Sequence, residues 1–457
     1  MTAAREETAR KRTSRILRRI GLLLSLIVQA PGGIAAQTPY QMGPAARTGG
    51  TYAITNATIV PVVGERIQRG TVVISEGRIT AVGANAPVPQ GASVIDANGL
   101  FVYPGLIDAG TVLGISEIGQ GAPGGQDLDE LGDFNPEINP IVAINPFSEI
   151  IPTVRVNGIT TAITAPRGGQ VSGQATLIDL FGWTANEMAV LPSAAMVMTY
   201  PRTGGGGGFG GGGGFGGQQS AEQQRERVAR ESRALREFLG NAKAYAEVKA
   251  RNGDSSLART DLAMEAMVPV MRGQTPVIFD VETADQIRGA LSLADSFGLR
   301  IIIRGGLYSW QLADTLAARR IPVILGPLTQ NPPAGEPYDM IYATPGVLHR
   351  AGVTIAFRTN DAADSRNLPY NVALATAYGL DPNEALRALT INPARIFGVQ
   401  DRLGSIEVGK AANIIVTTGD PLDVRTTVRH LFIRGQPVPF NDRHTRMYEA
   451  FRARPRQ

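Results

Sequence analysis

The sequence predicts an α/β protein in which a (β/α)8 barrel is flanked by strand-rich chain ends. Short β-branched apolar runs alternate with helical stretches through the middle of the chain, a pattern typical of parallel β/α units. The stretch between Pro104 and Leu403, about 300 residues, has the length of a single barrel. A doubly wound sheet is the alternative, and it lacks support because no glycine-rich dinucleotide-binding loop follows any of the apolar runs.

The first 36 residues have the layout of a secretory signal peptide. A run with seven cations and two carboxylates precedes an apolar stretch at 20–28, and small residues suited to a signal peptidase follow it. We therefore expect an exported protein, periplasmic or extracellular, and the adjacent Arg18 and Arg19 leave both general secretion and twin-arginine export open. The apolar stretch is too short to cross a bilayer, so no transmembrane segment is expected in the mature chain.

The net charge of +4 belongs to this leader, because its charges sum to +5 and the rest of the chain therefore carries −1. A nucleic-acid partner is excluded on that ground. The chain has no cysteine, which excludes a disulfide scaffold, a thiolate zinc site and a cysteine nucleophile. It has three histidines in 457 residues, so imidazole-based metal chemistry has few candidate ligands.

Both ends of the chain after the leader are expected to form strands, and the middle is expected to alternate strands with helices. The expected end strands are 52–60, 70–75, 78–82, 412–417 and 428–433. The expected middle strands are 159–163, 276–279, 299–303, 321–325 and 353–357, with helices at 283–297, 309–319 and 371–378. Twelve glycines in 204–217 predict a flexible insertion, which a polar helix at 221–251 with one apolar stripe follows. Residues 441–457 are expected to be a solvated, arginine-rich tail.

Residues 101–108, with the sequence FVYPGLID, resemble the first barrel strand of the amidohydrolase superfamily, and of its imidazolonepropionase-like members in particular. The resemblance extends through segments at 145–174, 279–284, 321–327 and 352–357, and it is strongest at 368–410. It implies a TIM barrel at 104–403 beside a small β-sandwich built from residues 51–103 and 404–440. It also implies hydrolysis of non-peptide carbon–nitrogen bonds in cyclic amides, by water that divalent cations at the strand ends activate.

The sequence departs from this family pattern at nearly every metal-ligand position. The His-x-His pair of the first strand corresponds to Gly110 and Val112, and the histidines of the fifth and sixth strands correspond to Asp280 and Arg304. The aspartate of the last strand corresponds to Asn360, or to Asp361 one residue later. The histidines of the chain are interpreted as structural residues away from strand ends: His349, His430 and His444. No transition-metal site is therefore expected.

Charged side chains at the predicted strand ends form the candidate site, because the strand ends of a barrel converge on one mouth. The candidate catalytic residues are Asp108, Asp280 and Asp361, and the candidate ligand-binding residues are Arg304, Arg358, Glu282 and Asn360. Carboxylates without a cation would repel one another, and guanidiniums can supply the missing charge through paired hydrogen bonds. We therefore expect Arg304 and Arg358 to pair with Asp280 and Asp108, either around a retained pocket or as salt bridges that close it.

Two functions stay open at this point. The first is an exported, non-catalytic homologue without a cofactor, which binds a small carboxylate or amide at the mouth or associates with an active amidohydrolase. The second is an active hydrolase that holds magnesium or manganese on oxygen ligands, which such hard cations prefer. The carboxylates proposed for that cation are Asp108, Asp280, Glu282 and Asp361.

Overall fold

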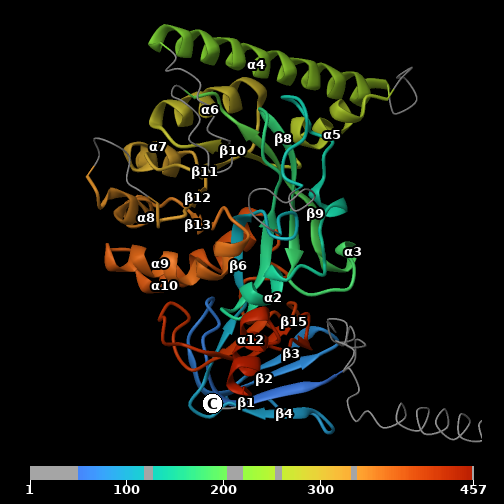
Figure 1. Ribbon diagram of the computed structural model, residues 1–457, viewed down its shortest axis with the longest axis vertical. Helices are drawn as coiled ribbons and strands as arrows, with labels where there is room; N and C mark the ends of the chain where they lie inside the picture. The colour runs from blue at the N-terminus through green and yellow to red at the C-terminus, as the bar shows by residue number, and fades with distance from the viewer. Residues whose placement is uncertain (1–49, 118–126, 203–219, 253–259, 331–336, 455–457) are drawn as a thin grey trace, which may run out of the picture. The chain divides into compact units, whose positions relative to one another are not determined.

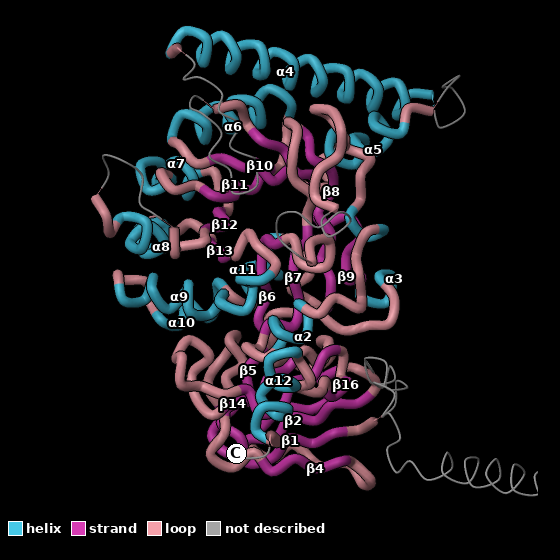
Figure 2. Tube along the Cα trace, viewed as in Figure 1, coloured by secondary structure: helices cyan, strands magenta, loops and turns pink. Residues whose placement is uncertain are grey.

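Two eight-stranded sheets form the framework of the computed structural model (Figures 1 and 2). The structure describes residues 50–117, 127–202, 220–252, 260–330 and 337–454. All of these residues belong to one unit, Ala45–Gln457. The predicted signal peptide at 1–36 and the predicted glycine insertion at 204–217 lie outside the described residues.

The middle of the chain folds as a nearly closed α/β barrel, as predicted. Its eight strands follow one another around the sheet in chain order: β6 (Leu106–Thr111), β7 (Ile159–Thr164), β8 (Val171–Asp179), β9 (Ala189–Thr199), β10 (Val277–Val281), β11 (Ile301–Gly305), β12 (Val323–Leu325) and β13 (Ile355–Phe357). The last strand returns to the first, because the backbone N–H of Asn360, just after β13, donates to the carbonyl of Gly110 in β6 at 2.9 Å.

One barrel strand runs against the others, which differs from the predicted parallel β/α units. β8 pairs antiparallel with β7 and with β9, whereas the other neighbouring pairs in this sheet are parallel. The connection at 165–170 is too short for the helical crossover that a parallel pair needs. Gly168 and Gly169 within it have positive φ angles of 85° and 62°, which suit a tight reversal of the chain.

Helices occupy most of the other connections around the barrel (Figure 1). The helix predicted at 283–297 is α6 (Ala284–Phe297), where Thr283 and Gln286 form a reciprocal capping box at the start and Gly298 ends the helix in the left-handed conformation. Further helices are α2 (Ile150–Arg155), α3 (Ala185–Met188), α5 (Leu262–Met271), α7 (Ala313–Ala318), α8 (Met340–Arg350), α9 (Leu368–Ala377), α10 (Pro382–Ala388) and α11 (Ile391–Ile396). Within the described ranges, no helix is both long enough and apolar enough to cross a membrane.

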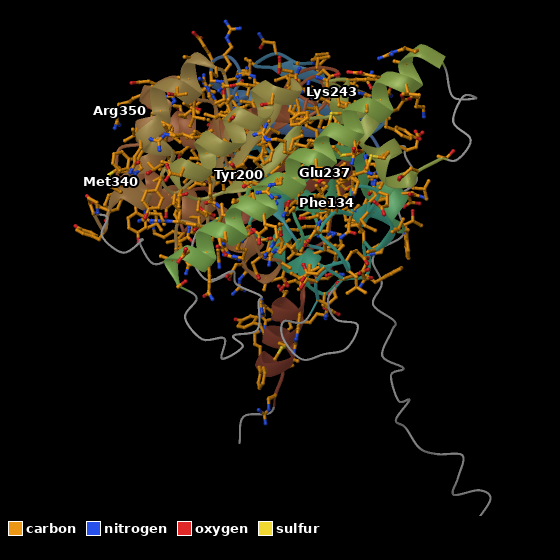
Figure 3. The ribbon with its side chains drawn as sticks, turned by 90° about the horizontal axis from the view of Figure 1, so that it is seen from above. Phe134, Tyr200, Glu237, Lys243, Met340 and Arg350 are labelled. Atoms are coloured by element: carbon orange, nitrogen blue, oxygen red, sulfur yellow. The ribbon has the colours of Figure 1, made fainter. Side chains whose placement is uncertain are left out.

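The long polar helix predicted at 221–251 is α4 (Ala221–Asn252), and it packs on α5 and α6. Leu235 and Leu239 of its predicted apolar stripe are fully buried, and the Tyr245 hydroxyl donates to Glu265 of α5 at 2.6 Å. Its outer face carries exposed charges such as Glu237 and Lys243 (Figure 3). The helix therefore covers the outside of the barrel, as its stripe predicted.

Side chains along the barrel strands alternate between two apolar clusters. One cluster takes a residue from every strand and fills the barrel interior, and the other lies between the strands and the helices. Ile278 of β10 and Ile302 of β11 belong to the interior cluster. Asp280 and Arg304 stand two residues further along the same strands, so the period of two turns both of them inward.

The second sheet combines strands from both chain ends, as predicted. Its strands are β1 (Tyr52–Ile59), β2 (Ile67–Ser75), β3 (Arg78–Gly83), β4 (Ser93–Asp96), β5 (Phe101–Pro104), β14 (Ile414–Thr417), β15 (Val428–Ile433) and β16 (Gln436–Pro437). β14 pairs with β5, so hydrogen bonds join the two chain ends in one continuous sheet. The sheet has a core of its own, which includes Ile54, Val72, Ile414 and Phe432.

The tail that was predicted to be solvated forms a helix, α12 (Arg443–Arg452), and all residues of this helix are exposed. Asp442 caps the first turn by accepting hydrogen bonds from the backbone N–H groups of His444 and Thr445. Arg446 pairs with Glu149, at the start of α2, at 2.7 Å. No residue of α12 is buried, so the helix contributes little to the core.

Candidate functional site

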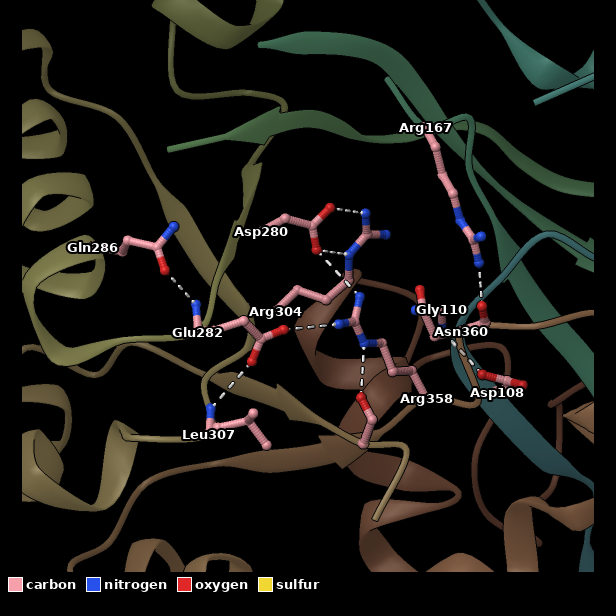
Figure 4. A network of polar contacts seen from close by, with 11 residues as sticks. Asp108, Gly110, Arg167, Asp280, Glu282, Gln286, Arg304, Leu307, Arg358 and Asn360 are labelled. Carbon is pink, nitrogen blue, oxygen red and sulfur yellow. Dashed lines mark hydrogen bonds and ion pairs between the residues drawn. The ribbon is translucent and has the colours of Figure 1, made fainter. Parts of the chain in front are cut away.

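The ends of β10 and β11 and the segment after β13 bring four predicted site residues together inside the barrel mouth (Figure 4). Arg304 of β11 binds Asp280 of β10 through two bonds: Nε donates to Oδ1 at 2.7 Å, and Nη2 donates to Oδ2. Arg358 reaches the same carboxylate, with Nη1 3.2 Å from Oδ1 of Asp280. Asp280 therefore carries two guanidiniums, and the predicted pairing of Arg304 with Asp280 is confirmed.

Glu282 completes this group at longer range. Nη2 of Arg358 lies 3.7 Å from Oε1 of Glu282, and the backbone N–H of Leu307 donates to Oε2 at 3.4 Å. Arg358 is also fixed by its Nε, which donates to the carbonyl of Gly326 at 3.0 Å. The side chains of Arg304 and Arg358 are only 6% and 7% exposed, while those of Asp280 and Glu282 are 28% and 35% exposed. The carboxylates are thus partly exposed, whereas the guanidiniums are nearly buried.

The two carboxylates have opposite electrostatic surroundings. Burial raises the pKa of Asp280, but the charges and hydrogen bonds of Arg304 and Arg358 outweigh it, and the pKa falls below its ordinary value. Burial also raises the pKa of Glu282, and here the more distant Arg358 only partly offsets it, so the pKa stays above its ordinary value. Asp280 is therefore the ionised centre of the site.

Gly110 lies where the family pattern has a histidine, and the two arginines occupy the neighbouring space. A Cβ atom at Gly110 would lie 3.2 Å from Cβ of Arg358 and 3.5 Å from Cδ of Arg304. The contact with Arg358 would be tighter than side chains normally make, so a larger side chain at this position would require the arginine stems to shift. Glycine here and arginine on the facing strands are therefore sterically linked.

Asp108 lies outside this group, so its predicted pairing with an arginine is wrong. Arg358 pairs with Asp280 and Glu282 instead. Asp108 is fully buried and accepts hydrogen bonds from the backbone N–H of Gly110 at 3.0 Å and from the Thr359 hydroxyl at 2.5 Å. Its neighbour Ile107 faces the barrel interior, so alternation turns Asp108 to the opposite face. Burial raises the pKa of Asp108 to about 7, against the lowering effect of these hydrogen bonds.

Asp361 and Asn360 also do not join the arginine–carboxylate group through their side chains. Asp361 is exposed, and its carboxylate accepts a hydrogen bond from the backbone N–H of Asp364 in the turn η4 (Ala363–Asn367). Asn360 has a φ of 59°, a conformation that asparagine tolerates, and it contributes its backbone to the barrel closure. Their candidate catalytic and ligand-binding roles stay predictions, and their positions favour structural ones.

Arg167 is a mouth residue that the sequence analysis did not include. It follows β7, and its Nη2 donates to the carbonyl of Asn360 (Figure 4). Its charge also contributes to lowering the pKa of Asp280, which places it near the group. The signal for it was present in the sequence, because a cation directly after a predicted strand has the same reason to reach the mouth as Arg304.

The donor set at the mouth does not fit a divalent cation. Both oxygens of Asp280 already accept from guanidiniums, and Gly110 offers no side-chain ligand. In the part of the chain that the structure describes, no three His, Cys, Asp or Glu side chains are grouped so that they could hold a metal ion. His349 lies 3.8 Å from Glu384, and His444 lies 3.8 Å from Asp442, both away from the strand ends.

Comparisons with known proteins connect this fold to a family. A model of the Amidohydrolase family matches residues 339–438. The amidohydrolase tasK of Hapsidospora irregularis is 25% identical in an alignment of 422 positions, which covers 82% of this chain but 41% of that longer protein. The imidazolonepropionase of Sphingopyxis alaskensis is 27% identical over 412 residues, 81% of this chain and 92% of the relative.

A solved structure gives the same result for the fold. An amidohydrolase from Thermotoga maritima superposes with a TM-score of 0.74 and 27% identity, over 85% of this chain and 99% of the other. Together these findings support an imidazolonepropionase-like member of the amidohydrolase superfamily.

Proposed function

We propose that this protein is an exported, non-catalytic member of the superfamily whose barrel mouth binds a small ligand in place of a metal ion. The observation that carries the proposal is the double engagement of Asp280 by Arg304 and Arg358. The two guanidiniums supply, next to Asp280, the positive charge that a metal cation would otherwise supply. Without a metal ion, water at this mouth lacks the activation on which the family chemistry depends.

The alternative, an active hydrolase with magnesium or manganese on carboxylates, requires four oxygen ligands to converge. Asp280 and Glu282 lie at the mouth, but Asp108 is fully buried on the other face of its strand and Asp361 caps an exposed turn. A hard cation needs several oxygen ligands around one point. The separation of these carboxylates therefore favours the metal-free, non-catalytic proposal.

Bound-metal analysis together with an activity screen tests this proposal. The chain from residue 37 onward is purified without chelator, its metal content is measured by mass spectrometry, and cyclic amides and dipeptides are assayed with added magnesium, manganese or zinc. We expect far less than one ion per chain and no turnover. Stoichiometric metal, or cation-dependent turnover that Asp280→Asn abolishes, would overturn the proposal and favour the active hydrolase.

Export is the second part of the proposal, and it depends on the first 36 residues. Fused to a reporter enzyme that is active only outside the cytoplasm, these residues should give reporter activity in a bacterial host. Replacing Arg18 and Arg19 by lysine should leave the signal intact for general secretion and abolish it for twin-arginine export. A reporter that stays inactive with the unmodified leader would contradict export.

The ligand or partner belongs to this proposal as well. A small carboxylate or amide at the mouth is favoured over association with an active amidohydrolase, because the charged groups described above gather at the mouth. Measuring the molecular size of a mixture of this protein with an active amidohydrolase distinguishes the two possibilities. A stable complex would support the partner, and its absence would favour the small ligand.

A further inference from the structure

Hydrogen-bond donors outnumber acceptors at the barrel mouth. A guanidinium carries five N–H donors and no acceptor. Arg304 uses two of them on Asp280, and Arg358 uses one on Asp280 and one on Gly326. The ion pair of Arg358 with Glu282 is 3.7 Å long, which is beyond hydrogen-bond range. More than half of the donors on these two side chains therefore lack an acceptor among the described residues.

A ligand can reach the unused donors. Both arginine side chains are more than nine-tenths buried, yet neither contributes a nitrogen to the described buried side-chain atoms that lack a hydrogen-bond partner, so their unused N–H groups lie at the surface of the site. Both guanidiniums are also held in place, because each donates to Oδ1 of Asp280 (Figure 4). A ligand that enters here meets fixed donors, so it gains most if it brings several acceptor atoms and no donors.

The charges at the mouth, like its excess of hydrogen-bond donors, favour an anionic ligand. Arg304 and Arg358 together carry one positive charge more than Asp280 neutralises, and Arg167 adds another cation close enough to act on Asp280. Glu282 is the second carboxylate of the group, and it faces Arg358 at a longer distance than Asp280 does. A neutral amide would bring one acceptor oxygen and no negative charge, so it would satisfy fewer of the guanidinium donors than a carboxylate or a phosphate does.

We propose that Arg304 and Arg358 form a binding site for a small oxyanion, a carboxylate or a phosphate, where the superfamily pattern has metal ligands. This inference deepens the proposed function and rests on it, because it needs a mouth without a metal ion. The forked N–H geometry of each guanidinium matches the two oxygens of a carboxylate or of a phosphate edge. Titration with acetate and with inorganic phosphate shows which of the two classes of oxyanion the site binds.

Calorimetric titration of the chain from residue 37 onward with sodium acetate, sodium phosphate and acetamide tests the inference. Sodium chloride keeps the ionic strength constant, so that general screening is the same in every titration. We expect saturable binding of acetate or of phosphate, with a matching rise in melting temperature, and no binding of neutral acetamide. If neither anion binds better than chloride, the inference is overturned.

Variants locate the site. The double variant Arg304→Gln/Asp280→Asn removes one charge of each sign, so the net charge of the mouth is unchanged and Arg358 keeps Glu282 at 3.7 Å, and it should weaken anion binding at least tenfold. Arg358→Lys keeps the charge but loses the fork, and it should weaken binding by a smaller factor. Arg319→Gln removes an exposed arginine that pairs with Asp295 of α6, and it should bind like the parent protein.

The outcomes separate this inference from the proposed function. Anion binding that the double variant retains would place the anion elsewhere and overturn the inference. A protein that contains no metal and ignores both anions would contradict the inference alone. Stoichiometric metal in the purified protein, measured before any anion is added, would contradict the proposed function first.

Discussion

Asp280 is the residue on which the charges at the barrel mouth depend, because it is the shared partner of Arg304 and Arg358. Asp280→Asn keeps the shape but removes the negative charge that pairs with two nearly buried guanidiniums. Measured by urea unfolding, we expect it to lower the free energy of unfolding by about 2–4 kcal/mol, between the values for exposed and buried pairs. Adding Arg304→Gln should recover part of this loss, and purely additive effects would contradict direct coupling.

Asp108 should give the protein a distinct dependence on pH. Its carboxyl has a pKa of about 7 in the folded chain and 3.8 as the ordinary value. The folded state therefore binds this proton more tightly than the unfolded state does. The stabilisation that follows from protonated Asp108 is complete below about pH 4 and is lost as pH rises to about 7.

Asp108→Asn removes that dependence, because asparagine does not titrate. Relative to the variant, the parent protein should lose on the order of 4 kcal/mol of unfolding free energy between pH 4 and pH 7. Urea unfolding of both proteins across this range measures the difference. Parallel stability curves would contradict the raised pKa.

At the scale of elements, Gly105 joins β5 of the second sheet to β6 of the barrel. A Cβ atom there would lie 2.1 Å from the hydroxyl of Thr160, which is fully buried and stiff because it is β-branched. Gly105→Ala should therefore lower the free energy of unfolding by about 1–3 kcal/mol.

A glycine inside α4 provides the matched control. A Cβ atom at Gly240 meets nothing within 4 Å, so Gly240→Ala should raise the free energy of unfolding by about 0.5–1 kcal/mol through helix propensity. Denaturant unfolding of the two variants tests both expectations. Equal destabilisation by Gly105→Ala and Gly240→Ala would contradict the difference in packing around the two glycines.

Local sequence patterns predicted the positions of individual helices and strands well. The strand at 428–433 coincides with β15, and the helix at 283–297 lies within one residue of α6, because alternation, caps and glycine stops are local signals. β8 and β9 were not among the predicted middle strands, and the antiparallel direction of β8 was missed with them, although the short connection at 165–170 with its two glycines was visible in the sequence.

At the scale of the whole molecule, the second sheet depends on the C-terminal segment. β14 lies between β5 and β15, and the core of this sheet takes Ile414, Val416 and Phe432 from that segment. A chain that ends at Leu403 should lose cooperative unfolding in calorimetry. A chain that ends at Phe440 lacks only α12, which buries no residue, and it should keep its transition. Cooperative unfolding of the shorter chain would contradict the interdependence of the two chain ends.

The sequence by itself determined the barrel, the strand-rich chain ends, the family and most of the residues that gather at the mouth. The barrel, the strands and the mouth residues follow from periodicity and from the rule that strand ends converge, whereas the family follows from the resemblance of residues 101–108 and 368–410 to the superfamily. Tertiary structure alone decided the partners: Arg358 bonds Asp280 and approaches Glu282, while Asp108 turns to the other face and binds Thr359. The physical reason is that a partner across a closed barrel depends on strand neighbours, on the phase of alternation at each strand end and on the space left at Gly110, none of which is a local property of the chain.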